Sequence, residues 1–354
     1  MPIPPLYGHE GTRNRLVGAI ASGRLPQALL FEGPRGVGKQ RLALWLAQAL
    51  VCERAGGKAG GEGREGCGEC QQCKLVLNLS HPDVHWFVPL EPSKKSGDAD
   101  KQVDVAEEAL AMEMAARREQ PLYESASGLA IHGIAAIRLL LRRLALKPAL
   151  GQRKVFVIGD AERLVPQVGT EAAANALLKA LEEPPPNTVF VLTAAEPDAL
   201  LPTILSRVVR VRVARHADSI VAAFVQRELG VTGQRAVAQR VAVAEGSIGR
   251  VLAEGERQDR GGEGAERFAT AVKAGPVGRY AFALGQQPFQ ARGGFTEMLD
   301  GLLERLREQA RSGEETGRVV RAIAQVLEAR TLAQGNLNPQ LVAAVLGSDL
   351  GTAG

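Results

Sequence analysis

The chain has 354 residues, enough for two or three domains, and its hydrophobic fraction of 45% and charged fraction of 23% are those of a globular protein. The net charge of +4, from 43 basic and 39 acidic residues, is too small to indicate direct DNA binding. The N-terminus has no secretory-signal pattern, and no apolar run approaches the roughly 20 residues of a membrane span. We therefore expect a cytoplasmic protein with no membrane partner.

The first chemical motif follows a predicted buried strand at 28–31. It matches the phosphate-loop pattern G-x-x-x-x-G-K, and the apolar spacing after it predicts a helix. Backbone N–H groups at such a helix N-terminus bind phosphate, and the lysine ammonium reaches the outer phosphates of ATP or ADP. The residues expected to bind phosphate are Gly33, Gly36, Val37, Gly38 and Lys39.

The position after this lysine departs from the motif. A serine or threonine normally offers a hydroxyl to Mg²⁺ there, but this chain has Gln40. A carboxamide on a longer stem is a poor substitute for that ligand. We expect phosphate binding to survive this change and efficient metal-assisted hydrolysis to be lost.

All the cysteines of the chain lie within one short window, at Cys52, Cys67, Cys70 and Cys73. The last three form a C-x-x-C-x-x-C run, and a glycine-rich stretch separates them from the first. This arrangement predicts a structural zinc site with a closed shell of ligands, in a module at about 52–73. The lack of a secretory signal disfavours disulfides. An iron–sulfur cluster and free thiols remain as alternatives.

Two further strands are predicted at 154–158 and 188–193. In phosphate-loop enzymes an acid at the end of a strand holds Mg²⁺ and orients the attacking water. Taken alone, Asp160 fits that role, with Glu162 as a solvated residue at a helix start. The other strand ends at Thr193, whose hydroxyl either senses a γ-phosphate or caps the strand.

The segment 177–208, LLKALEEPPPNTVFVLTAAEPDALLPTILSRV, is highly specific. Together with the phosphate loop, the cysteines and His81–Asp83, it resembles the clamp-loader subunits of bacterial DNA polymerase III holoenzyme. The resemblance covers most of residues 6–255, and Asn338–Leu341 is similar to the collar of that family. It is weakest at about 91–130, which has the pattern of an insertion that contains a helix.

The resemblance implies an α/β fold of the AAA+ type. It places a phosphate-loop domain with a mainly parallel sheet at 1–213, a small helical lid at 214–255 and a helical collar for oligomerisation at 256–354. The composition of Glu254–Glu266 favours a linker. A collar helix is predicted from apolar residues at helical spacing, namely Phe295, Met298, Leu299, Leu302, Leu303 and Leu306.

The family contains an ATP-hydrolysing gamma/tau subunit and a delta-prime subunit that does not hydrolyse ATP. Aligned on the ATPase pattern, the metal-binding acid falls on Gly159, and Asp160 takes the position of the catalytic glutamate. The sensor arginine falls on Gly249, with Arg250 displaced by one residue. With Gln40, these departures favour the delta-prime type; a hydrolysing gamma/tau-type subunit is the alternative.

The Ser206-Arg207 pair matches the trans-acting arginine motif of the family, although Val208 stands where cysteine is usual. The resemblance implies that Arg207 is an arginine finger for a neighbouring subunit; the alternative is a surface charge. The implied role is a stator that works with gamma/tau-like and delta-like subunits to load the sliding clamp onto primed DNA. An unrelated phosphate-loop ATPase with a zinc module is a third, weaker interpretation.

Overall fold

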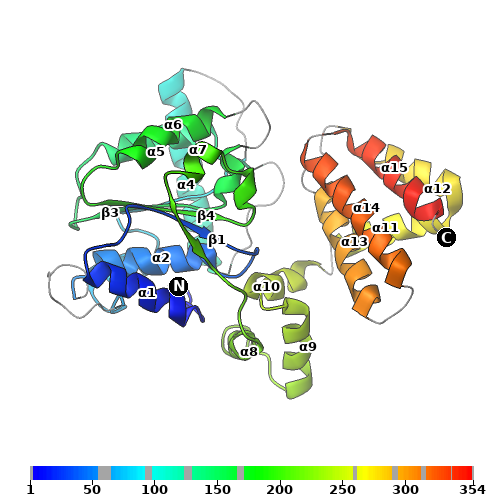
Figure 1. The fold of residues 1–354 in the computed structure, drawn as a ribbon, viewed down its shortest axis with the longest axis horizontal. Coiled ribbons are helices and arrows are strands. Elements are labelled where there is room, and N and C mark those ends of the chain that lie inside the picture. The colour runs from blue at the N-terminus through cyan, green and yellow to red at the C-terminus, as the bar shows by residue number, and fades with distance from the viewer. Residues whose placement is uncertain are drawn as a thin grey trace. The chain divides into compact units, whose positions relative to one another are not determined.

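The computed structural model describes residues 3–54, 65–91, 98–122, 130–165, 171–257, 261–288, 294–311, 316–335 and 337–352 (Figure 1). These residues form two compact units, one ending at Leu252 and the other beginning at Ala253. Each unit has its own hydrophobic core. None of the described helices is long and apolar enough to cross a membrane.

The first unit is built on a parallel sheet. Its described strands are β1 (Ala28–Glu32), β2 (Val84–Phe87), β3 (Lys154–Ile158), β4 (Thr188–Ala194) and β5 (Val209–Arg212). They lie in the order β2-β3-β4-β1-β5. The central strands β1, β3 and β4 are buried along almost their whole length, as expected for strands covered on both faces. The three predicted strands are confirmed; the two edge strands were not predicted.

Helices cover both faces of this sheet, with α1 and α2 on one side and α5 and α6 on the other (Figure 1). Nearly every residue of α2 is buried, because this helix packs against β1, β3 and β4. The described helices associated with the sheet are α1 (Glu10–Ala21), α2 (Lys39–Val51), α3 (Gln71–Leu77), α5 (Ile134–Leu144), α6 (Ala172–Glu182) and α7 (Pro202–Leu205). Two short 3₁₀ turns, η1 (Ala161–Leu164) and η2 (Pro197–Ala199), lie between them.

The region of weakest family resemblance contributes one long helix, α4 (Ala99–Glu119), which packs along α5. Its first turn is capped by the Asp98 carboxylate, which accepts a hydrogen bond from the Lys101 N–H at 2.9 Å. Glu107 of α4 forms ion pairs with Arg142 and Arg143 of α5. The helix predicted within 91–130 is confirmed, while residues 92–97 and 123–129 lie outside the described part of the chain.

Three helices follow β5 and enclose a small core of their own. They are α8 (Asp218–Arg227), α9 (Gln234–Ala244) and α10 (Ile248–Arg257). Their packing buries apolar side chains at helical spacing, namely Val221, Val225, Val237, Ala244 and Val251. These helices occupy the stretch for which the sequence predicts a lid.

The second unit is a helical bundle. Its described helices are α11 (Gly261–Lys273), α12 (Gly275–Leu284), α13 (Gly294–Arg311), α14 (Thr316–Gln334) and α15 (Pro339–Thr352). Phe295, Met298, Leu299, Leu302 and Leu303 of α13 are buried in its core, and Leu306 packs against that core. The amphipathic helix predicted from this spacing is therefore confirmed.

The stretch Glu254–Glu266, for which the sequence predicts a linker, begins beside the boundary between the two units, and its described part is helical. The helix α10 continues to Arg257 and α11 begins at Gly261, although residues 258–260 lie outside the described chain. A Cβ atom added at Gly264 would lie 3.2 Å from Cβ of Met298, so this glycine permits close helix packing. The burial of Ala265 and Phe268 on the same helix offsets the propensity cost of glycine, about 1 kcal/mol per residue.

Candidate functional site

The phosphate loop lies at the carboxyl end of β1 and leads into α2. Gly38 precedes the helix with φ 86, and Lys39 is its first residue. Gly36 has φ 75, a left-handed conformation that glycine adopts without steric cost. The loop therefore has the strand, turn and helix setting in which backbone N–H groups bind phosphate.

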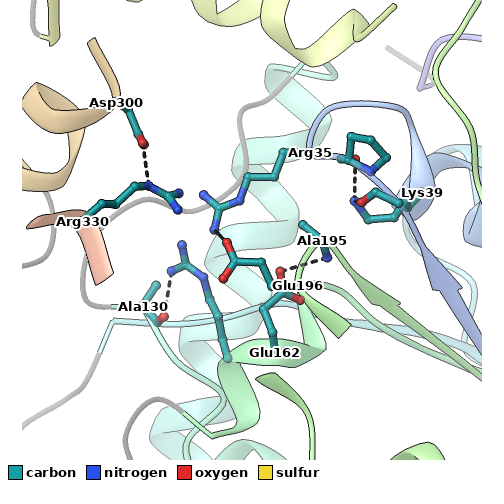
Figure 2. Close-up of polar contacts among 11 residues, drawn as sticks. Arg35, Lys39, Ala130, Glu162, Ala195, Glu196, Asp300 and Arg330 are labelled. Atoms are coloured by element: carbon teal, nitrogen blue, oxygen red, sulfur yellow. Dashed lines mark hydrogen bonds and ion pairs between the residues drawn. The ribbon is translucent and has the colours of Figure 1, made fainter. Parts of the chain in front are cut away.

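The side chain of Lys39 is folded back onto its own loop (Figure 2). Its Nζ atom donates hydrogen bonds to the carbonyl oxygens of Gly33 and Pro34, both at 2.8 Å. Burial lowers the pKa of Lys39 to about 8, against the opposing effect of the Glu162 and Asp160 carboxylates. The ammonium group is thus hydrogen-bonded within the loop.

The Gln40 side chain is buried beside Gly159, which follows β3. Its Oε1 atom accepts a hydrogen bond from Nε1 of Trp86 at 3.0 Å. A Cβ atom added at Gly159 would lie 2.5 Å from this oxygen. The carboxamide therefore fills the space that a side chain at position 159 would need. These two positions carry neither the hydroxyl nor the carboxylate that suits Mg²⁺.

The start of α10 lies directly on the phosphate loop. The N–H of Gly249 donates a hydrogen bond to the carbonyl of Gly36 at 2.8 Å. A Cβ atom at Gly249 would lie 2.5 Å from Cα of Gly36, so this close approach leaves no room for an arginine side chain. The displaced Arg250 is instead ion-paired with Glu245.

The neighbouring carbonyls of the loop are also occupied. Nε2 atoms of His9 and His216 lie 2.7 and 3.1 Å from the carbonyl oxygen of Val37, and the two ring centroids are 4.3 Å apart. Because a carbonyl oxygen only accepts, both Nε2 atoms carry the donated proton. Ser247 Oγ donates to the carbonyl of Arg35 at 3.0 Å. No motif signals these contacts, which join residues far apart in the sequence.

A cavity of about 410 Å³ opens beside the two histidines. Its lining includes Arg15 from α1 and Arg212 and Arg215 from the end of β5. The lining also includes Glu10 of α1, and Arg215 is ion-paired with Glu245, so the cavity carries charges of both signs.

The two acids after β3 have different surroundings. The Asp160 N–H donates to Oγ1 of Thr193 at 3.0 Å, and this threonine is fully buried. Glu162 is also buried, and its Oε1 accepts a hydrogen bond from the Ala195 N–H at 3.1 Å (Figure 2). Burial raises the pKa of Glu162. Its interpretation as a solvated residue is wrong, because η1 turns this side chain toward the end of β4.

Arg207 follows α7 and contacts its own helix. Its guanidinium donates to the carbonyl of Thr203 at 3.0 Å and pairs with Glu182 at 3.1 Å. The side chain is 28% exposed. Among the described residues, the hydrogen bonds and the ion pair of Arg207 are to Thr203, Ser206 and Glu182, none of which belongs to the phosphate loop.

The cysteine side chains converge at one point between α2 and α3. The sulfur atoms of Cys52, Cys67, Cys70 and Cys73 all lie within 4.8 Å of one another. The Cys67–Cys73 and Cys52–Cys70 sulfur distances are both 3.9 Å. A disulfide requires about 2.05 Å. A tetrahedral zinc with Zn–S bonds of about 2.3 Å requires sulfur separations near 3.8 Å.

Backbone N–H groups support this arrangement. Cys67, Cys70 and Cys73 donate N–H···S hydrogen bonds to Cys52, Cys67 and Cys70, at 3.4, 3.3 and 3.4 Å. The hydrogen bond from Cys70 is the main reason that the pKa of Cys67 is lowered to about 6. Burial raises the pKa of Cys73, so without a metal the thiolate, the form in which cysteine binds a metal, is favoured at Cys67 and disfavoured at Cys73. The four residues fit a closed tetrahedral metal site.

The sheet order, the phosphate loop after β1 and the helices that follow β5 together define an α/β phosphate-loop protein of the AAA+ class. Residues 8–217 match the family described as DNA polymerase III, delta subunit, and the chain belongs to this family.

Several curated proteins are similar in sequence. The DNA polymerase III subunit delta' of Yersinia pestis is 33% identical over 193 residues, which are 54% of this chain and 43% of that protein. The delta' subunit of Escherichia coli is 29% identical over 239 residues, covering 68% of this chain and 57% of that protein. The gamma/tau subunit of Mycobacterium tuberculosis is 31% identical over 202 residues, covering 57% of this chain and 27% of that protein. The alignment thus spans about half the length of the delta' relatives.

Two buried histidines next to the site predict a loss of stability in acid. Burial lowers the pKa of His132 and the pKa of His216, each to about 4. His132 donates a hydrogen bond to the carbonyl of Gly159. In the unfolded chain histidine takes up a proton near pH 6.5, so stability should fall as the pH drops from about 6.5 to about 4. For His132 the loss is on the order of 3 kcal/mol. The free energy of unfolding, determined by urea denaturation at several pH values, measures this loss.

His132→Gln provides the control for this prediction. Glutamine can donate to the same carbonyl but does not titrate, so the variant should lose less stability on acidification than the wild type. Equal losses in the two proteins would show that His132 does not contribute.

Proposed function

We propose that this protein is a delta-prime-type subunit of the bacterial DNA polymerase III clamp loader, one that does not hydrolyse ATP. Its proposed partners are gamma/tau-like ATPase and delta-like subunits, and through them the sliding clamp and primed DNA. The proposed compartment is the cytoplasm. Membership of the DNA polymerase III delta family and the similarity to delta' and gamma/tau subunits support this assignment.

One observation carries the non-hydrolysing assignment. The carboxamide of Gln40 lies against Gly159, in the space between the two positions from which a hydrolysing relative would hold Mg²⁺. Without the metal, the charge that develops on the transferred phosphoryl group is not neutralised. ATP or ADP can be a ligand of the loop without being a substrate. The domains proposed are the phosphate-loop domain at 1–213, the lid at 214–255 and the collar at 256–354.

The purified chain should therefore hydrolyse ATP no faster than the buffer background. Lys39→Ala should leave this rate unchanged, and Gln40→Thr alone should not raise it, because position 159 still lacks an acid. Phosphate release from radiolabelled ATP measures the rate. Steady hydrolysis by the wild type that Lys39→Ala abolishes would instead establish a gamma/tau-type ATPase subunit.

We further propose that the four cysteines bind one structural zinc ion per chain. Four protein ligands leave no position open for water, so the ion would hold the module at 52–73 together and take no part in chemistry. The sulfur distances and the N–H···S hydrogen bonds support this assignment.

Elemental analysis should find one zinc per chain. Because metal binding stabilises the folded module, Cys73→Ser should lose the zinc and lower the temperature of thermal unfolding. A strong chelator should destabilise the wild type and leave the variant unaffected. Protein that contains iron, or no metal, would exclude the zinc assignment.

Arg207 is proposed as the group that this chain supplies to a neighbour. A guanidinium is always charged and presents a planar pair of donors to phosphate oxygens. Such a finger at a γ-phosphate contributes about 10³–10⁵ in rate. Its partly exposed position and its contacts, which are confined to Thr203, Ser206 and Glu182 among those described, support a role outside the chain's own phosphate loop.

Arg207→Ala should fold and retain its metal, because a partly exposed ion pair at the surface is worth only about 0–1 kcal/mol. Assembled with an ATPase partner, the variant should lower clamp-stimulated ATP hydrolysis and slow clamp loading. Arg207→Lys should recover little, since a point charge lacks the bidentate geometry. Glu182→Gln is the matched control: it breaks the ion pair, retains the guanidinium and should leave both rates unchanged. Wild-type rates with Arg207→Ala would contradict the finger.

A further inference from the structure

Gln40, Trp86 and Gly159 meet at the end of the sheet from three adjacent elements, α2, β2 and β3. Trp86 is 4% exposed and Gln40 is 8% exposed, so their hydrogen bond lies in the interior. A buried indole N–H without a partner is costly, and Gln40 Oε1 supplies that partner. The two side chains are therefore fixed by each other.

Glycine is needed at position 159 because of its contact with Gln40 and not because of its own backbone conformation. Its φ is outside the left-handed region, so its conformation is open to any residue. A Cβ atom there would nevertheless lie 2.5, 2.7 and 2.9 Å from Oε1, Cδ and Nε2 of Gln40. The end of a glutamine normally moves aside at little cost. Here the hydrogen bond to Trp86 and the surrounding core hold it in place.

The helix α4 reaches this site through Trp86. The guanidinium of Arg117 lies 4.4 Å from the centre of the Trp86 ring, a cation–π geometry. Arg117 is only 3% exposed, and its Nε atom donates to Glu113 at 2.9 Å. The region that least resembles the family thus packs behind the residue that holds Gln40.

We propose that the Gln40 side chain is a plug, meaning that it fills the position of the cation in the phosphate loop. Trp86 and Arg117 are the residues that position it. The proposal rests on the proposed function, which assigns positions 40 and 159 to metal binding in hydrolysing relatives. It adds that the two departures from the ATPase pattern form one coupled pair. It also gives α4 a role as the support of the plug.

The plug is tested by a double-mutant cycle on the full chain, read as the midpoint of thermal unfolding. Gly159→Ala should lower the midpoint by several degrees in the wild type, because the new methyl group meets a fixed carboxamide. In a Gln40→Ala background the same change should have little effect, because the carboxamide is gone. Equal shifts in both backgrounds, or no shift in the wild type, would overturn the plug.

Gly249→Ala is the matched control. Its added Cβ atom would also come within 2.5 Å of a neighbour, but that neighbour is the backbone of Gly36. Its shift should be the same with and without Gln40. A Gly249→Ala shift that also disappears in the Gln40→Ala background would show a general loosening of the site and would overturn the specific contact.

The supporting residues are tested in the same assay. Trp86→Phe keeps an aromatic ring beneath Arg117 but removes the N–H, so Gly159→Ala should lower the unfolding midpoint by less in that background. In an Arg117→Met background, Gly159→Ala should likewise lower the unfolding midpoint by less than it does in the wild type. If Gly159→Ala lowers the midpoint by the wild-type amount in both backgrounds, the positioning role of Trp86 in β2 and Arg117 in α4 is overturned. These measurements use no nucleotide, so ATP hydrolysis by the wild type would overturn the proposed function without altering the cycle.

Discussion

The site depends on the parallel alignment of β1, β3 and β4. Parallel neighbours bring their carboxyl ends to one edge of the sheet, so the residues that follow each strand are forced together. The phosphate loop meets the turn at Gly159 and Thr193 there, although more than a hundred residues separate the loop from either of them. Because this edge is close-packed, a change at one of these positions is felt at the others.

The polar groups of the phosphate loop are satisfied by hydrogen bonds from within the chain. The Lys39 ammonium is satisfied by loop carbonyls, and the next carbonyls are hydrogen-bonded by residues of the lid stretch and by His9. The loop carbonyls thus accept from Lys39 in place of a phosphate oxygen, and they receive from other parts of the chain the donors that solvent would otherwise supply. Gly249 completes the closure, since only a residue without a side chain allows this approach to Gly36.

Other functional candidates of the first unit are built differently. Arg207 follows the short helix α7 and is partly exposed, with contacts that a phosphate could replace at small cost. The cysteine centre joins the end of α2 to the start of α3, so a metal there would fix the chain where it leaves the phosphate-loop helix. These features agree with the proposed action of Arg207 on a neighbouring subunit.

The sequence alone determined the parts whose signals are local. Strand, loop and helix around Lys39 follow from a motif with fixed spacing, and the cysteine set follows from C-x-x-C spacing. It also located the departures at Gln40 and Gly159. Only the tertiary structure decided that these two positions touch, that Glu162 is buried and that Arg117 of α4 lies over Trp86. The physical reason is that burial and side-chain contact depend on which strands are neighbours, and a contact between residues 40 and 86 or 159 leaves no periodic pattern along the chain.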